Sequence, residues 1–349
     1  MAVTIAVRSK GEPCSFAAAP GEAILHAGLR SGLALPYECG TGTCGTCKAR
    51  LVEGDVHSRW PEAPGHKNLK REAGEFLMCQ ALPRGDVTIE VPRVVGRIAS
   101  SASVPAPLRG VIRLSAPLTH DVVRLDVEPA RSVRFDAGQF MLMTVPAIEG
   151  ARAYSMVNFT PEASPLQFVI KKKPDGVLNE WLFAGDATGT EVELFGPLGA
   201  ATFHPDDGMH LLLIAGGSGV AGMMSILERA VQHGYFADHA GHLFFGVRAP
   251  RDAFFLEELT ALRTRSGPGL EVTIALSDED VDPALAARHP ALSFARGFVH
   301  RVAGDAMKGR YDRIRAYAAG PPVMVEATLK MLLVEGRLRP ADIRYDKFS

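Results

Sequence analysis

The sequence predicts a multidomain chain: an N-terminal α+β domain, an antiparallel β-barrel, and a C-terminal α/β domain with a parallel sheet. The first observation is length, since 349 residues exceed the roughly 100–200 residues of one ordinary domain. The second is a series of short strand-like segments with regularly spaced turn signals, which is typical of a barrel. The third is a change near Pro205 to strands that alternate with helices, which predicts a parallel sheet with helices on both faces.

The N-terminal domain is expected over residues 1–92. Apolar residues alternate along Val3–Val7 and again along Val87–Val91, as they do in half-buried strands. Between them, Glu22–Arg30 places its isoleucine and two leucines on one helical face. Residues 93–107 are rich in small residues and prolines without any period, so we expect a linker there.

The barrel is expected over residues 108–204 and the nucleotide-binding type of parallel-sheet domain over residues 205–349. Strand-like segments of the barrel include Val122–Val127 and Leu166–Ile170, and one short helix is expected near Leu178. In the C-terminal domain, the predicted strands have the sequences LLLIAG, HLFFGV, EVTIAL and YAAG.

Composition excludes several classes of function. The formal net charge is −1, with 47% hydrophobic and 22% charged residues, so no global basic field favours nucleic-acid binding. The first ten residues lack the apolar core of a signal peptide. The apolar run Leu211–Leu227 is interrupted by four glycines, and a strand, turn and helix explain it better than a membrane span. We therefore expect a cytoplasmic protein without a membrane segment.

Four of the five cysteines predict an iron–sulfur cluster. Cys39, Cys44 and Cys47 follow the C-x4-C-x2-C spacing of plant-type [2Fe–2S] domains, and Cys79 supplies the fourth thiolate. The glycines between them suit a loop that turns backbone N–H groups toward sulfur. The alternative is a structural zinc site, but such sites usually pair two short knuckles. Cys14 stands alone and is interpreted as a small, partly buried residue.

A flavin site is predicted in the barrel, where Arg152, Ala153, Tyr154 and Ser155 form a strand. The arginine can neutralise the FAD pyrophosphate with a planar fork. The tyrosine ring can pack on the isoalloxazine, and the serine hydroxyl can hydrogen-bond flavin N5.

Two further segments are expected at the same cofactor. Gly176, Val177 and Leu178 open a short helix whose N-terminus suits a pyrophosphate. The main chain of Val169, Ile170 and Lys171 could line the FAD. For Lys171–Lys173, a solvated basic turn is an equally good interpretation.

A nicotinamide nucleotide site is predicted at two strand ends, formed by Gly216, Gly217, Ser218 and Gly219 and by Ala319, Gly320 and Pro321. The segment from Gly217 also matches G-x-G-x-x-G. We interpret that match as partly accidental, because the second strand ends at Arg248 where a conventional Rossmann domain has an acidic residue. For Ala319–Pro321 an ordinary strand-to-helix turn is the alternative.

With these segments in order, the chain resembles the ferredoxin–NAD(P) reductase superfamily, and more narrowly the reductase components of multicomponent bacterial oxygenases. It is similar to the reductases of carbazole dioxygenase and of toluene monooxygenase. The resemblance covers essentially the whole chain and is carried by PYECGTGTCGTCKARLVEG, RWPEAPG, RAYSM, IAGGSGVAG, FFGVR, AAGPPVMVEAT and IRYDKFS.

The resemblance implies a plant-type ferredoxin (β-grasp) domain, an FAD-binding barrel and an NAD(P)-binding domain. It implies that the four clustered cysteines ligate the [2Fe–2S] cluster, that Phe348 lies near the flavin ring, and that the segments above hold FAD and nucleotide. Because the cofactors carry the chemistry, we name no general acid, base or nucleophile. Many relatives have cysteine at Ala319, but carbazole-type reductases share the alanine, so we expect slower or differently tuned hydride transfer rather than its loss. Many relatives have proline at Gly222, so we expect a more flexible helix start here.

The implied activity is electron transfer from NADH, rather than NADPH, through FAD and the cluster to a separate oxygenase or a small shuttle ferredoxin. We expect a monomer serving an aromatic-ring-hydroxylating dioxygenase of the Rieske type. One alternative is the reductase of a diiron monooxygenase. A second, non-enzymatic alternative is a redox carrier or sensor whose C-terminal module only binds nucleotide. The sequence leaves the substrate of the oxygenase open.

Overall fold

The computed structural model describes residues 1–99, 103–146, 148–173 and 176–347. The contacts among these residues divide the chain into two compact units. The first unit consists of Met1–Arg109, Phe140–Ala153 and Val192–Leu198. The second unit consists of Gly110–Gln139, Tyr154–Glu191 and Gly199–Ser349.

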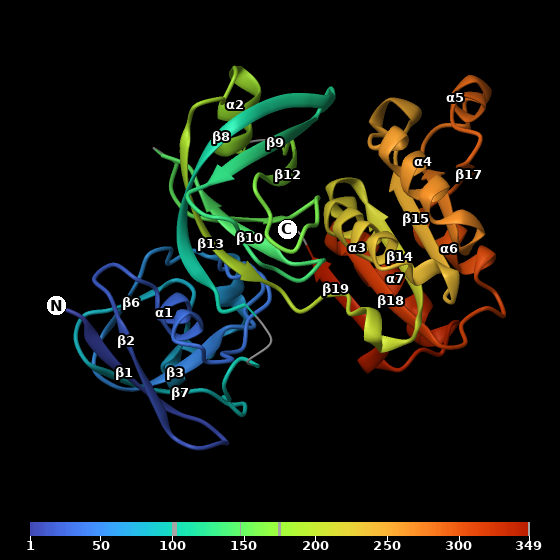
Figure 1. Ribbon diagram of the computed structural model, residues 1–349. Helices are drawn as coiled ribbons and strands as arrows, with labels where there is room; N and C mark the ends of the chain where they lie inside the picture. Colours follow the sequence, from blue (N-terminus) through green and yellow to red (C-terminus); the bar gives the residue numbers. More distant parts are fainter. Residues whose placement is uncertain (100–102, 147, 174–175, 348–349) are drawn as a thin grey trace. The chain divides into compact units, whose positions relative to one another are not determined.

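The N-terminal region is a mixed five-stranded sheet with a helix, α1 (Ile24–Arg30), packed on it (Figure 1). The strand order is β2-β1-β7-β3-β5, with β1 antiparallel to β2 and parallel to β7. The apolar residues of α1 are buried, which explains why this face of the helix seals the sheet. The strands are β1 (Val3–Arg8), β2 (Cys14–Ala18), β3 (Lys48–Glu53), β5 (Glu75–Leu77) and β7 (Val87–Glu90), and a second sheet pairs β4 (Val56–Ser58) with β6 (Ala81–Pro83).

A nearly closed antiparallel barrel follows, with the strand order β11-β10-β13-β8-β9-β12. A single bridge between Met156, just beyond β11, and Phe168 of β12 joins the two ends of that order. One helix, α2 (Val177–Ala184), follows β12. The strands are β8 (Ala106–Thr119), β9 (Val122–Pro129), β10 (Phe140–Thr144), β11 (Arg152–Ser155), β12 (Leu166–Lys171) and β13 (Glu191–Leu198). The predicted barrel is therefore confirmed, and its strands contribute to both compact units.

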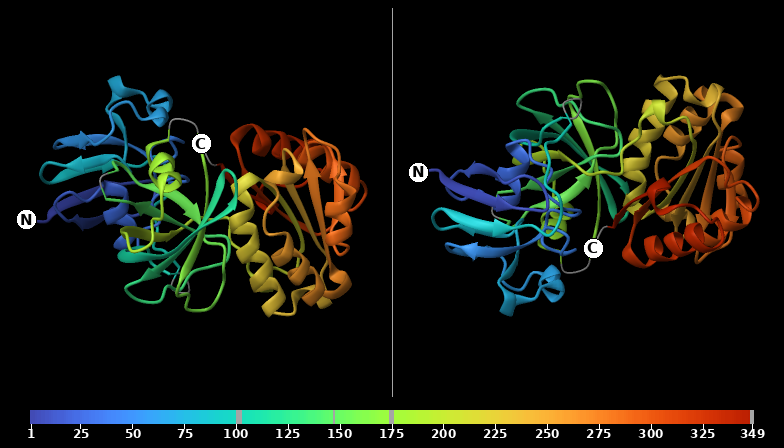
Figure 2. Two further views of the ribbon diagram at one scale, coloured as in Figure 1. Left: turned by 90° about the horizontal axis from the view of Figure 1, so that it is seen from above. Right: turned by 90° about the horizontal axis from the view of Figure 1, so that it is seen from below.

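The C-terminal region is a six-stranded parallel sheet covered by helices on both faces (Figure 2). The strand order β17-β16-β15-β14-β18-β19 reverses direction between β14 and β18. In open parallel sheets, ligands bind at the carboxyl ends of the strands where the order reverses. The strands are β14 (His210–Gly216), β15 (Gly241–Val247), β16 (Leu270–Leu276), β17 (Ser293–Arg296), β18 (Ile314–Gly320) and β19 (Ile343–Lys347).

Five helices connect these strands and bury the sheet. They are α3 (Val220–Gln232), α4 (Leu256–Arg265), α5 (Pro283–Arg288), α6 (Val299–Ala306) and α7 (Pro322–Val334). Helix α3 contacts α4, whereas α6 contacts α7, so the longer helices form two pairs. Within the part of the chain described here, every helix is too short or too polar to span a bilayer.

Candidate functional site

The four cysteines predicted to bind a cluster lie together in the first unit. Cys47 and Cys79 are buried, and their Sγ atoms are 3.2 Å apart without a disulfide. Cys39 and Cys44 are half-buried on the preceding loop. The backbone N–H groups of Thr41 and Cys44 each lie 3.4 Å from Cys39 Sγ. Four convergent sulfurs with amide donors aimed at them fit a [2Fe–2S] cluster.

Within the loop, one contact has opposite effects on two of the cysteines. The thiol of Cys44 donates to Cys39 Sγ and lowers the pKa of Cys39, with help from Thr41 and Thr43 and against the effect of burial. The same contact raises the pKa of Cys44. Thiolates, not thiols, are the metal ligands, so Cys44 must lose its proton when metal binds.

A second segment braces the cluster loop from outside. The N–H of Gly65 donates to the carbonyl of Gly42 at 2.9 Å, and Asn68 Nδ2 donates to the carbonyl of Cys44 at 3.0 Å. The segment RWPEAPG, residues 59–65, is linked to this site in the sequence only by the family resemblance. The role of Asn68 was missed, because a lone asparagine outside any motif gives no sequence signal for a long-range contact.

The predicted flavin residues lie on β11, where side chains alternate between the two faces. Arg152 and Tyr154 are half-buried and occupy one face, while the other face carries Ala153, also half-buried, and Ser155, which is 6% exposed. The strand thus offers a cation and an aromatic ring on one side and a hydroxyl on the other.

The guanidinium of Arg152 is held by the backbone. Its Nη1 donates to the carbonyls of Glu149 and Gly150 at 2.8 and 2.6 Å. These bonds orient the planar group, which can present its remaining N–H donors to an anion. Elsewhere in the barrel, Gly176–Leu178 forms the N-terminus of α2, with Gly176 as the N-cap. Backbone N–H groups at such an end suit a pyrophosphate.

Strand β12 provides main chain and a lysine. Val169 and Ile170 are buried, and β12 stands last in the strand order, so its outer edge meets no described strand beyond the Met156 bridge. The Nζ of Lys171 pairs with Asp121 Oδ2 at 2.7 Å. The same side chain lies at the nucleotide loop, because a Cβ built on Gly217 would be 3.6 Å from its Cδ. Lys171 is therefore a partnered side chain rather than part of a solvated turn.

The two glycine-containing segments predicted for the nucleotide meet at the carboxyl ends of β14 and β18. Gly216–Gly219 and Ala319–Pro321 leave adjacent strands paired in register. A Cβ on Gly219 would lie 2.3 Å from the carbonyl oxygen of Ala319, and one on Gly320 would lie 2.9 Å from the carbonyl oxygen of Gly216. The loops are in direct backbone contact, and only glycine permits that approach.

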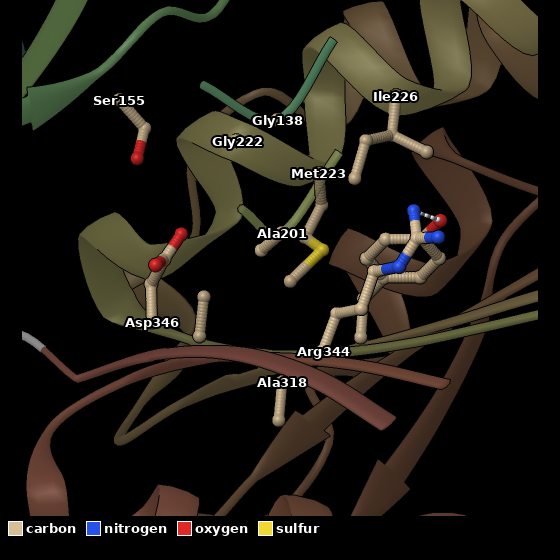
Figure 3. Close-up of a pocket in the computed structure, with 11 residues that line it drawn as sticks. Gly138, Ser155, Ala201, Gly222, Met223, Ile226, Ala318, Arg344 and Asp346 are labelled. Atoms are coloured by element: carbon tan, nitrogen blue, oxygen red, sulfur yellow. Dashed lines mark hydrogen bonds between the residues drawn. The ribbon is translucent and has the colours of Figure 1, made fainter. Parts of the chain in front are cut away.

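A small, partly open cleft lies beside these loops in the second unit (Figure 3). Ser155, Gly222, Ala319 and Asp346 are among its lining residues, and the oxygen atoms of Ser155 and Asp346 are directed toward one another. Asp346 was missed by sequence reasoning, although it belongs to the IRYDKFS ending. Its position follows from the pairing of β19 with β18, which sets it beside Ala319. Phe348 lies outside the described residues.

A network of charges follows the second strand of the parallel sheet. Arg248 donates to Asp252 Oδ2 at 3.2 Å and to Asp121 Oδ2 at 3.5 Å. His120 Nε2 is 3.8 Å from both carboxylates. Burial raises the pKa of Asp121, but the hydrogen bond and charge of Lys171 outweigh it and lower the pKa. The guanidinium of Arg248 is therefore opposed by two carboxylates.

Comparisons with known proteins match three domain families along this chain. Residues 7–84 match the 2Fe-2S iron-sulfur cluster binding domain, residues 108–203 the oxidoreductase FAD-binding domain, and residues 213–330 the oxidoreductase NAD-binding domain. The chain is 34% identical to the ferredoxin–NAD(P)+ reductase CarAd of Metapseudomonas resinovorans, over 94% of this chain and 95% of that one.

Two further similarities extend over full lengths. The ferredoxin–NAD+ reductase component of the alkene monooxygenase system of Xanthobacter autotrophicus is 33% identical, over 96% of this chain and 98% of its own. The solved structure of the ferredoxin reductase in carbazole 1,9a-dioxygenase superposes with a TM-score of 0.83 at 31% identity, covering 100% of this chain and 99% of that one.

Proposed function

This chain belongs to the ferredoxin–NAD(P)+ reductase components of oxygenase systems, and we propose that it takes electrons from NADH and delivers them to a Rieske-type dioxygenase or its shuttle ferredoxin. The family establishes an oxidoreductase with a [2Fe–2S] cluster, FAD and a nicotinamide nucleotide. FAD, when bound, accepts two electrons as hydride and releases them singly, which joins NADH to a one-electron cluster. The observation that carries the proposal is the cysteine-lined site joined in one chain to the cleft between Ser155 and Ala319.

The residues proposed to hold each group follow from their placement. Cys39, Cys44, Cys47 and Cys79 would ligate the cluster. Arg152 to Ser155 would contact FAD, with Val169–Lys171 and Gly176–Leu178 lining it and its pyrophosphate. Gly216–Gly219 and Ala319–Pro321 would flank the nicotinamide nucleotide, and Phe348 is proposed near the flavin.

Selection of NADH over NADPH is supported by the charges around Arg248. A 2′-phosphate approaching this guanidinium would also meet Asp121 and Asp252, and like charges at short range repel. We expect kcat/KM for NADH to exceed that for NADPH by roughly tenfold or more. The double variant Asp121→Asn/Asp252→Asn should lower the ratio of kcat/KM for NADH to kcat/KM for NADPH. Asp238→Asn, in the loop before β15, should leave this ratio unchanged. A wild-type preference for NADPH would contradict the cofactor proposal.

The whole pathway is tested by anaerobic titration of the purified holoprotein with NADH. Loss of flavin and cluster absorbance together, consuming about three electrons per chain, would support the internal pathway. Bleaching of flavin alone would contradict it. Failure of NADH to bleach either chromophore, in protein that dithionite bleaches, would rule out the NADH reductase function.

The partner is tested by reconstitution with purified candidate acceptors. We expect product formation with a Rieske oxygenase or its ferredoxin. The relative from an alkene monooxygenase system, aligned over 98% of its length, favours a monooxygenase as the second candidate, and we propose the diiron class for it. Genes beside the coding sequence identify which acceptor to purify, since a Rieske protein carries paired Cys and His ligands and a diiron protein carries Glu-x-x-His helices. Turnover with a diiron hydroxylase alone would replace the first candidate with the second.

A further inference from the structure

Two strands of the FAD-binding barrel share a hydrophobic core with the cluster domain. Phe140 and Leu142 of β10 and Phe195 and Leu198 of β13 are each less than 10% exposed, in one cluster with the buried residues of the N-terminal sheet and α1. All of these residues belong to the first compact unit. The cluster domain therefore has an apolar docking surface on the barrel, rather than a linker alone.

Two contacts across this surface come close to the cluster site. The imidazole of His26, on α1, stacks on the ring of Phe195, with 4.3 Å between ring centroids and 20° between planes. A Cβ built on Gly40, the residue after the ligand Cys39, would lie 3.3 Å from Leu142 Cδ1. The backbone of the cluster loop at Gly40 therefore packs directly against Leu142 of β10, because glycine has no side chain to separate them.

The polar groups around His26 make this contact unusual. Its Nε2 is shielded from solvent and has no hydrogen-bond partner among the described residues. Burial, together with the positive charge of Arg59 and against the charge of Glu22, lowers the pKa of His26 to about 4. Arg59 also donates from Nη2 to the carbonyl of Cys79 at 3.5 Å. Burial and the nearby positive charge of Arg59 both disfavour a charged imidazole at this position.

We propose that His26, Phe195 and Leu142 are positioning residues that hold the cluster loop against strands β10 and β13 of the FAD-binding barrel. The proposal rests on the electron-transfer function above. The docking contact should loosen when His26 is protonated. Because electron transfer slows as its path lengthens, a loss of packing at this contact should be measurable as slower reduction of the cluster.

The structural test is hydrogen exchange of the full chain. In Phe195→Ala, peptides containing α1 and the Cys39–Cys47 loop should exchange faster than in the wild type at pH 7.5. After correction for the slower intrinsic exchange at low pH, the protection of these peptides in the wild type should fall between pH 7 and pH 5. In His26→Phe, which keeps a stacked ring, protection should not change with pH in this way. Phe159→Ala truncates a buried phenylalanine of the second unit that is in edge-to-face contact with Phe135, and should leave these peptides protected.

The kinetic test follows the two chromophores of the holoprotein after mixing with NADH. We expect the rate of flavin bleaching in Phe195→Ala and Leu142→Ala to stay within about twofold of the wild-type rate, and the rate of cluster bleaching to fall by more than this. If Phe195→Ala does not fold, Phe195→Leu replaces it. Unchanged exchange, or faster exchange with unchanged cluster bleaching, would overturn the proposal. If NADH bleaches nothing in the wild type, the proposed function fails, while hydrogen exchange still decides the docking contact.

Discussion

The cluster loop of the N-terminal domain and the nucleotide loop of the C-terminal domain are both rich in glycine, but they require glycine for different physical reasons. In the cluster loop, Gly40, Gly42 and Gly45 have φ values of +66°, +93° and +82°, a region that side chains disfavour. In the nucleotide loop, Gly219 has an ordinary φ of −61°, but the carbonyl of Ala319 occupies the place of its Cβ. One loop needs glycine for its own backbone shape, whereas the other needs it to admit a neighbouring strand.

The difference separates local from long-range determination. The cluster loop carries three of its four ligands within nine residues and shapes itself around them. The nucleotide site exists only because β14 and β18, about a hundred residues apart in sequence, lie in register. Mutations should therefore act differently in the two regions.

The largest effect is expected at the cluster, where the ligands act as a set. Cys47→Ser removes one buried thiolate of the pair with Cys79. We expect loss of the cluster absorbance and a fall in NADH-dependent cytochrome c reduction of roughly a hundredfold or more. Reduction of ferricyanide, which can take electrons from flavin directly, should persist.

Cys14→Ser is the matched control, because Cys14 lies in β2 outside the ligand set. Its visible spectrum and both activities should equal those of the wild type. Retention of the cluster in Cys47→Ser, or its loss in Cys14→Ser, would show that the ligand set is wrong.

The second effect tests the need for space in the nucleotide loop. Gly219→Ala forces a methyl group against a backbone carbonyl that cannot turn aside, and overpacking of this kind costs up to about 3 kcal/mol. Gly217→Ala meets only the Cδ of Lys171 at 3.6 Å but has a φ of +53°, a strain of about 1 kcal/mol. The melting temperature of Gly219→Ala should be lower than that of Gly217→Ala, and the KM for NADH should rise more in Gly219→Ala. The reverse order would mean that backbone conformation, not space, governs this loop.

The same division explains what could be predicted from sequence. The cysteine spacing, the Arg152–Ser155 strand and the loop before α3 are local patterns, and each indicated its domain. Asp346 and Asn68 reach their places through strand register and a long loop, which no local pattern encodes. The sharing of β10 and β13 with the cluster domain could not be predicted either, because it depends on which barrel face meets α1. The assigned roles of the site residues and the domain limits at 92, 107 and 204 remain predictions.

The third effect concerns pH, and it should appear only in the cluster region. His26 has a lowered pKa of about 4 against 6.5 in the unfolded chain, so the unfolded state binds the proton more readily between these values. The stability that depends on neutral His26 is complete above pH 6.5 and is lost as pH falls toward 4. Relative to His26→Phe, the wild type should lose about 2 kcal/mol between pH 7 and pH 5. If the free energies of unfolding of the two proteins, from denaturant titrations at each pH, change in parallel, the fold does not lower the pKa of His26.

The smallest effect is expected at Gly222, in the first turn of α3. Its built Cβ would lie 3.5 Å from the Cβ and Oγ of Ser155, an ordinary van der Waals contact. Glycine in a helix is less stable than alanine by up to about 1 kcal/mol. Gly222→Ala should therefore raise the melting temperature by roughly 1–4 °C and leave FAD affinity within about twofold. A fall in FAD affinity with an unchanged melting temperature would mean that Gly222 keeps the space beside Ser155 open for the flavin. Gly222 would then be glycine for the same reason as Gly219, namely a lack of space for a side chain.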